Sequence, residues 1–289
     1  MAGRDTPEAR YARIVADRLR DGRGKGTGAG YRPWLDVRTK GLNSNTWRPC
    51  GKNGRTYHLL SNIEFAIFAI LDRLDSTTDL REQFPLLPLE ETQRIAEDMG
   101  RPHPRACPFQ DKGGPKVDIV MTTDLVVDLA ERPDLPANVA ISVKRAGALT
   151  DTPLKVRNLL AKAEIERRYW QARDTPFLLI TDADLPDVVR DNADLLQRYT
   201  SLKGVELPAS VDELASHLLD RIVAAPGLPA RDHGVAFDKA MGLRRGTGTN
   251  LIWHSLATNR WTVDPNERLD AARSLFGAAP NPAFKETNP

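Results

Sequence analysis

Two segments rich in valine and isoleucine, residues 117–130 (VDIVMTTDLVVDLA) and 137–145 (ANVAISVKR), most constrain how this chain can fold. Such residues favour β-strands, so both segments are expected to be central strands of a sheet. A long charged helix is expected over residues 153–172, followed by a buried strand over 175–181 (TPFLLIT). This order of elements predicts a mixed α/β sandwich whose core strands come from the middle of the chain.

Further helices are expected before these strands. Residues 7–20 place apolar side chains at helical spacing on an arginine-rich segment, which predicts a short basic helix. Residues 59–74 are nearly all apolar, which predicts a buried helix. A short strand that Pro85 and Pro88 terminate comes next, with a helix near 89–99.

The pattern changes after about residue 183. From there only helical patterns follow, and then a short strand at 260–264, which together suggest a winged helix. The helices are expected at residues 186–200, 210–224, 233–241 and 248–257. We therefore expect an N-terminal domain over 1–183 and a small, mainly α C-terminal domain over 184–289, with disorder from about residue 276.

Composition narrows the function classes. Two cysteines cannot form a disulfide framework, and no apolar run approaches the length of a membrane span, so a cytoplasmic protein is expected. The net charge of +2 is unevenly distributed, because residues 1–60 carry 13 Lys and Arg against 5 Asp and Glu. A basic first fifth on a mildly acidic remainder suggests a polyanionic partner.

The two central strands carry unusual polar residues. Asp124 lies within an apolar strand, where burial disfavours a carboxylate. Side chains alternate along a strand, so Ser142 and Lys144 share one face of the next strand while Val143 points the other way. Lys144 needs a partner that Asp124 could supply, and a purely structural ion pair is an equally good interpretation.

Glu64 is the one ionisable residue in the apolar run of residues 59–71. Ser61 and Glu64 have the spacing of a capping box, which is a purely structural interpretation. Two carboxylates and a lysine nevertheless suit hydrolysis of a phosphodiester with a divalent metal ion, because Mg²⁺ keeps several waters and needs only one or two carboxylates.

The chain resembles the TnsA family, the transposon-end endonuclease subunit of heteromeric transposases. The matching segments follow the family's order and spacing over most of residues 22–181, and a C-terminal segment is similar too. They are GRGKGTGAGYRPW (22–34), HLLSNIE (58–64), REQFPLLP (81–88), RPHP (101–104), MTTDLVVD (121–128), ISVK (141–144), EIERRYW (164–170) and GTGTNLIWHSLATNRWTVD (246–264).

The resemblance implies a restriction-endonuclease-like catalytic domain with a winged-helix C-terminal domain. Glu64 and Asp124 match the family's metal-binding carboxylates, and Lys144 matches its catalytic lysine. The cofactor implied is Mg²⁺, with Mn²⁺ also accepted. Where the family usually has glutamine this chain has Ser142, so contact with the metal there is expected through water or through the Val143 backbone carbonyl.

Glu166, in EIERRYW, matches a glutamate that supports the site, and a surface ion pair with Arg167 or Arg168 is the competing interpretation. In REQFPLLP, a turn with a hydrophobic core role is favoured over contacts to DNA or to the site. The basic residues expected to contact DNA phosphates, or else to form a solvated helix face, are Arg10, Arg18, Arg20, Arg23, Lys25 and Arg32.

The expected activity is nicking of the 5′ strands at transposon ends, beside a partner transposase that cuts the 3′ ends. An AAA+ ATPase regulator is expected to bind the C-terminal domain, and the protein would associate with the nucleoid when bound to DNA. Two alternatives stay open. One is a stand-alone restriction- or resolvase-type nuclease, and the other is a non-catalytic adaptor that recruits the ATPase.

Overall fold

The structure, a computed structural model, describes residues 5–37, 46–108, 114–264, 266–275 and 277–281. The chain divides into two compact units. The first contains Met1–Phe65 and Ser76–Asp184, and the second contains Ala66–Asp75 and Leu185–Pro289. Residues 66–75, expected within the first domain, thus pack with the second unit.

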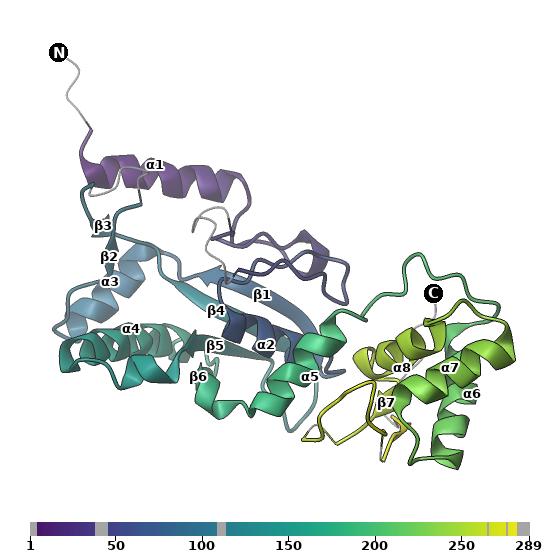
Figure 1. Ribbon diagram of the computed structural model, residues 1–289. Helices are drawn as coiled ribbons and strands as arrows, with labels where there is room; N and C mark the ends of the chain where they lie inside the picture. Colours follow the sequence, from purple (N-terminus) through teal and green to yellow (C-terminus); the bar gives the residue numbers. More distant parts are fainter. Residues whose placement is uncertain (1–4, 38–45, 109–113, 265, 276, 282–289) are drawn as a thin grey trace. The chain divides into compact units, whose positions relative to one another are not determined.

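A four-stranded mixed sheet is the centre of the first unit (Figure 1). Its strands, in spatial order, are β1 (Thr77–Pro85), β4 (Thr122–Leu129), β5 (Asn138–Lys144) and β6 (Phe177–Thr181). β1, β4 and β5 pair antiparallel, whereas β5 and β6 pair in parallel. The two valine-rich segments therefore supply the two central strands, as the sequence predicts.

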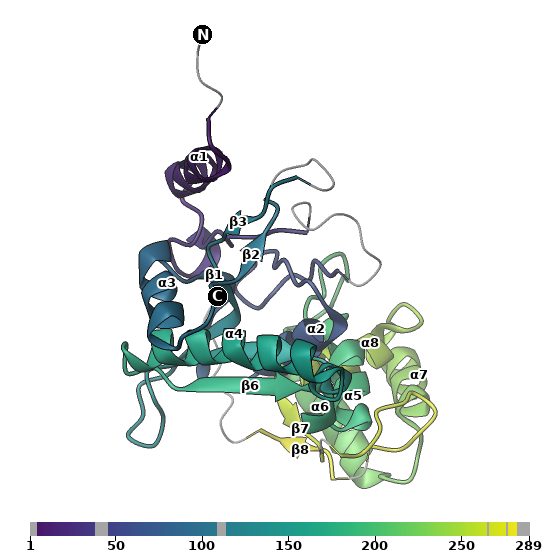
Figure 2. The same ribbon diagram turned by 90° about the vertical axis from the view of Figure 1, so that its left-hand side faces the viewer.

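Helix α4 (Pro153–Gln171) connects the parallel strands β5 and β6, as a parallel pair requires. Figure 2 shows α4 running beside β6. Helix α3 (Leu89–Asp98) packs against α4, and their apolar side chains meet those of the sheet. The core between helices and sheet includes Leu86, Ile95, Val126, Ala140, Ile165 and Trp170.

The segment at 117–130 is not one strand. Its first part, β3 (Val117–Asp118), pairs with β2 (Arg105–Ala106) in a separate two-stranded sheet, and β4 begins at Thr122. The predicted basic helix is α1 (Pro7–Arg20), which begins at the N-cap Thr6. The buried hydroxyl of Tyr11 accepts a hydrogen bond from the Val120 amide, so α1 is anchored beside this small sheet.

The second unit is mainly helical. It holds α5 (Asp187–Gln197), α6 (Val211–Ala224), α7 (Ala230–Met241) and α8 (Thr247–Ala257). Helix α2 (Asn62–Leu71) begins in the first unit and continues into the second from Ala66. The expected disorder from about residue 276 does not extend to β8 (Ala279–Pro280), which pairs with β7 (Trp261–Thr262), because Trp261 anchors the pair in the hydrophobic core.

Helix α8 lies in the core of this unit. Nine of its residues are buried, and its neighbours within the unit are α5, α6, α7 and β7. α7 and α8 approach closely because Gly234 and Gly248 meet at their crossing, where a Cβ on Gly248 would lie 2.9 Å from Gly234 Cα.

Candidate active site

Asp124 lies where β4 and β5 separate. The last paired residues of these strands are Leu125 and Ile141, so Asp124 and Ser142 lie just beyond the pairing. The Asp124 Oδ2 atom accepts hydrogen bonds from the Val143 amide at 2.7 Å and from Lys144 Nζ at 3.2 Å. The predicted pairing of Asp124 with the lysine of the next strand is therefore present.

The Lys144 ammonium is surrounded by oxygens. Besides Asp124, it donates to Ser142 Oγ at 2.9 Å and to the Val143 carbonyl at 2.8 Å. The contact with Ser142 agrees with the predicted alternation of side chains on β5. Burial lowers the pKa of Lys144, but the carboxylates of Asp124, Glu166 and Glu64 outweigh it and raise the pKa above its usual value, so the side chain stays charged.

Glu64 forms the capping box that its spacing from Ser61 predicts, and it also acts electrostatically on Lys144. A capping box is present, since Ser61 Oγ accepts a hydrogen bond from the Glu64 amide at 3.2 Å. In return, the Glu64 carboxylate accepts hydrogen bonds from the Leu60 amide and from the Ser61 hydroxyl, both at 2.9 Å. The same carboxylate raises the pKa of Lys144, which places it within electrostatic range of the Asp124–Lys144 pair. A capping role thus coexists with a place at the site.

Gln83 is the site contact that the sequence did not favour. It is 2 % exposed, and its Nε2 donates to Glu64 Oε2 at 3.2 Å while its Oε1 accepts from Thr122 Oγ1 at 3.1 Å. Residues 81–85 of REQFPLLP belong to strand β1 and do not form the expected turn, because they pair with β4. Its arginine serves the fold, since Arg81 pairs with Asp128. The motif therefore contributes both to the core and to the site. Which of its residues does which could not be told from its sequence, because it depends on the contacts in the folded chain.

Glu82, next to Gln83, is fully buried. Arg55 neutralises it through two hydrogen bonds, of 2.9 Å and 2.7 Å, and the His58 amide donates to it as well. Arg55 also lies over the rings of Tyr31 and Tyr57. Together with the hydrogen bond from the Tyr31 hydroxyl to the Glu82 carbonyl, this buried ion pair fastens Tyr31, Arg55 and Tyr57 to β1.

Glu166 is buried rather than paired with a surface arginine; it is Glu164 that pairs with Arg167 and Arg168. Glu166 Oε2 accepts from Thr123 Oγ1 at 3.3 Å, and Thr123 in turn accepts from Trp170 Nε1.

The environment of Glu166 keeps it protonated at neutral pH. Burial raises its pKa to about 8, and the Asp124 carboxylate adds to this, while Lys144 and the hydroxyls of Thr123 and Ser142 oppose it. At neutral pH a protonated carboxylic acid therefore lies beside the Asp124–Lys144 pair.

The predicted DNA-contacting residues lie on α1 and on the glycine-rich segment after it. Several of them make contacts within the unit. Arg18 lies over the Trp34 ring and Arg23 pairs with Asp36, while Arg20 pairs with Asp17 and Arg32 donates to the Asp21 carbonyl. The segment reaches the site, because the Trp34 amide donates to the Gln83 carbonyl at 3.1 Å. The residues that stay exposed at the surface are Arg10, Arg20, Lys25 and Arg32.

In the part of the chain that the structure describes, no three His, Cys, Asp or Glu side chains gather to hold a metal ion. Oxygen ligands are nevertheless concentrated at one point, where Asp124, Ser142 and the Val143 carbonyl all contact the Lys144 ammonium. Over the same described residues, no helix is long and apolar enough to span a membrane.

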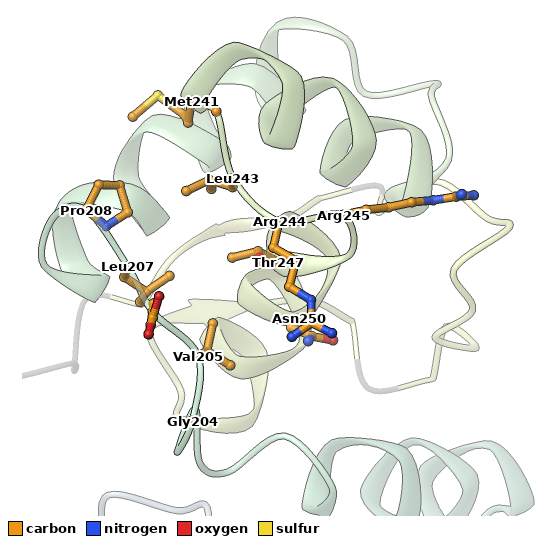
Figure 3. Close-up of a pocket in the computed structure, with 12 residues that line it drawn as sticks. Gly204, Val205, Leu207, Pro208, Met241, Leu243, Arg244, Arg245, Thr247 and Asn250 are labelled. Atoms are coloured by element: carbon orange, nitrogen blue, oxygen red, sulfur yellow. The ribbon is translucent and has the colours of Figure 1, made fainter.

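The second unit has a hollow of about 820 Å³ (Figure 3). Part of its wall is apolar, from Val205, Leu207 and Leu243, and Arg244 and Arg245 lie beside it. Figure 3 shows the Arg245 side chain extending away from the apolar residues. Neither arginine makes an ion pair with any residue that the structure describes.

A mixed α/β sheet whose two central strands carry a paired aspartate and lysine fits an endonuclease-like fold. A family model described as TnsA-like endonuclease N terminal matches residues 74–182, and one described as TnsA endonuclease C terminal matches residues 184–264. The chain belongs to the TnsA family of endonucleases.

A relative from Escherichia coli, the transposon Tn7 transposition protein TnsA, is 40% identical over 207 residues, which are 71% of this chain and 70% of that protein. Asp124, Lys144 and Glu166 lie inside the residues that the family models match, whereas Glu64 precedes them.

Proposed function

We propose that the chain is the Mg²⁺-dependent endonuclease subunit of a cut-and-paste transposase. It nicks the 5′ strands at the transposon ends, while a partner transposase cuts the 3′ ends. The observation that carries this proposal is a cluster of oxygens that already surrounds a positive charge. The Lys144 ammonium lies among the oxygens of Asp124, Ser142 and Val143. Membership of the TnsA family and the likeness to a transposition protein support the same activity.

The residues present fit a divalent metal ion. Carboxylate, carbonyl and hydroxyl oxygens are the ligands that Mg²⁺ and Mn²⁺ prefer, and Mg²⁺ needs few protein ligands because it keeps waters and takes phosphate oxygens. Asp124, Glu64 and the Val143 carbonyl would hold it, with Ser142 contributing through water. The bound ion would neutralise charge on the scissile phosphate and activate a water.

Lys144 supplies the remaining chemistry. Its raised pKa keeps the ammonium charged at every pH at which DNA is handled, so it can stabilise a phosphate oxygen or hold the attacking water. Glu166 supports the site as a neutral acid, which leaves the positive charge of Lys144 to the phosphate.

DNA would be held by the exposed basic residues of the first unit. Arg10, Arg20, Lys25 and Arg32 lie on α1 and the following segment, which reaches Gln83 beside Glu64. Contacts of this kind neutralise backbone phosphates without reading sequence, so affinity falls as salt rises.

The second unit is proposed to be a winged helix that binds protein. Helices α6, α7 and α8 followed by the β7–β8 pair support this architecture. Helix α8, which would be the reading helix, is buried along most of its length, and this favours a protein partner over a DNA groove. We assign the AAA+ ATPase regulator to the hollow beside Arg244, through a segment that is both acidic and apolar.

The hollow can be tested by charge reversal. Arg244→Glu is expected to weaken capture of the ATPase by the full-length protein. Arg221→Glu is the control, because Arg221 is exposed at the end of α6 and does not line the hollow. If both variants capture the ATPase equally well, the ATPase does not bind at this hollow.

Nicking is tested in the reconstituted transposition complex with Asp124→Ala and Lys144→Ala, which are expected to abolish 5′ cleavage while partner binding survives. Asp128→Ala is a matched control on the same strand, because Asp128 pairs with Arg81 away from the site. Persistent cleavage by Asp124→Ala would show that the site is misassigned.

The two alternatives give other results. A stand-alone nuclease would cut naked DNA without partners. A non-catalytic adaptor would show no Mg²⁺ or Mn²⁺ binding that depends on Asp124, measured by calorimetry.

A further inference from the structure

Gln83 has an unusual backbone conformation for a strand residue. Its φ is +48°, in the left-handed region that disfavours any residue with a Cβ, although β1 continues on both sides of it. Its register is kept, because Glu82 pairs with Leu125 and Phe84 with Thr123, which places Gln83 opposite Asp124. Such a conformation persists only where the surroundings enforce it, and it is typical of functional sites.

The orientation of the Gln83 amide follows from its partners. A carboxylate only accepts hydrogen bonds, so the amide nitrogen must face Glu64. The amide oxygen then faces Thr122, whose hydroxyl donates to it. Gln83 therefore connects the Glu64 carboxylate to the strand of Asp124, two residues before that aspartate.

The Glu64 carboxylate has contacts both within its own turn and with the sheet. The Leu60 amide and Ser61 Oγ belong to the same turn, so the capping box relates the carboxylate to the start of α2. Gln83 relates it to the sheet that carries Asp124 and Lys144.

We infer that Gln83 is a positioning residue, whose amide holds Glu64 at the distance from Asp124 at which the two carboxylates share one divalent cation. The inference rests on the proposed metal-dependent function. Residues that orient a metal ligand through a hydrogen bond typically change metal affinity by about 10- to 100-fold when they are removed.

The test is calorimetric binding of Mn²⁺ to the purified full-length protein without DNA. Gln83→Gly is the informative variant, because glycine adopts a positive φ without strain, so the fold is expected to survive while the amide is lost. We expect Mn²⁺ affinity about 10- to 100-fold below that of the wild type, with an unchanged or higher Tm. A purely structural glutamine would lower the Tm and leave the affinity unchanged.

Gln93→Ala is the matched control, since Gln93 also donates to a carboxylate of the first unit, Asp118 at 2.8 Å, and is expected to bind Mn²⁺ normally. Asp124→Ala is measured in parallel. If Asp124→Ala loses Mn²⁺ while Gln83→Gly binds it as tightly as the wild type, the inference is wrong and the proposed function stands. If Asp124→Ala binds Mn²⁺ normally, or the wild type binds none, the proposed metal site fails and the inference falls with it.

Discussion

Replacing Glu166 by glutamine tests the electrostatics of the site, because it removes the titrating group and keeps its shape. Burial, reinforced by the Asp124 carboxylate, raises the pKa of Glu166 from its ordinary 4.5 to about 8. Between these two pH values the unfolded chain has lost this proton while the folded chain keeps it. The folded state therefore binds more protons, and stability falls as the pH rises.

The magnitude follows from the size of the shift. At about 1.4 kcal/mol per pKa unit, a rise from 4.5 to about 8 means that ionisation of Glu166 removes on the order of 5 kcal/mol of stability. That stability is fully present below about pH 4.5 and lost as the pH passes about 8. Glutamine never ionises. We therefore expect the free energy of unfolding of Glu166→Gln, relative to that of the wild type, to rise by several kcal/mol from pH 5 to pH 9.

The assay is urea unfolding of both proteins at intervals from pH 5 to pH 9, followed by circular dichroism. Groups other than Glu166 titrate in both proteins and cancel in the difference. Glu164→Gln is the control on the same helix, because Arg167, opposed by some burial and assisted by Arg168, holds the Glu164 pKa at about 2, so its titration lies outside this range. A constant difference between the wild type and Glu166→Gln across the range would refute the reasoning.

Three further outcomes are expected. Lys144→Met removes a cation from the predicted metal ligands, so Mn²⁺ is expected to bind more tightly by calorimetry while nicking is lost; weaker binding would contradict this. Glu82→Ala leaves Arg55 buried without its carboxylate and is expected to cost about 3–5 kcal/mol in urea unfolding. Gly24→Ala would overlap a proline ring of β1 and is expected to cost about 2–4 kcal/mol, whereas Gly22→Ala, with a similar positive φ and open space, is expected to cost about 1 kcal/mol; equal losses would contradict the packing argument.

The order of helices and strands could be predicted from the sequence because it depends on local patterns of apolar and β-branched residues. The apolar repeat of residues 7–20 and the valine-rich runs give the same answer in isolation as in the fold. The predicted elements were wrong where the pairing of distant segments determines the structure. Val117–Asp118 reads as the start of the long strand but pairs with Arg105–Ala106, and composition alone does not reveal that Ala279–Pro280 pairs with β7.

The site divides in the same way. Asp124 and Lys144 are conspicuous in the sequence because a charge in an apolar strand needs a partner, and strand alternation shows which side chains share a face. Gln83 lies between Glu82 and Phe84 without any such contrast, and its left-handed backbone depends on tertiary contacts. Glu166 reads as one member of a charged helix, and only its burial against β4 distinguishes it from Glu164.

The protonation of Glu166 changes what the site can accept. Three carboxyl groups and one lysine would carry a formal charge of −2, but with Glu166 neutral the charge is −1. A divalent cation then brings the site to +1, which suits a DNA phosphate, whereas an ionised Glu166 would leave it neutral. In the proposed site the buried acid would therefore tune the attraction for DNA without occupying the oxygens proposed to hold the cation, and this would explain why a chain keeps a costly buried carboxyl group beside Asp124.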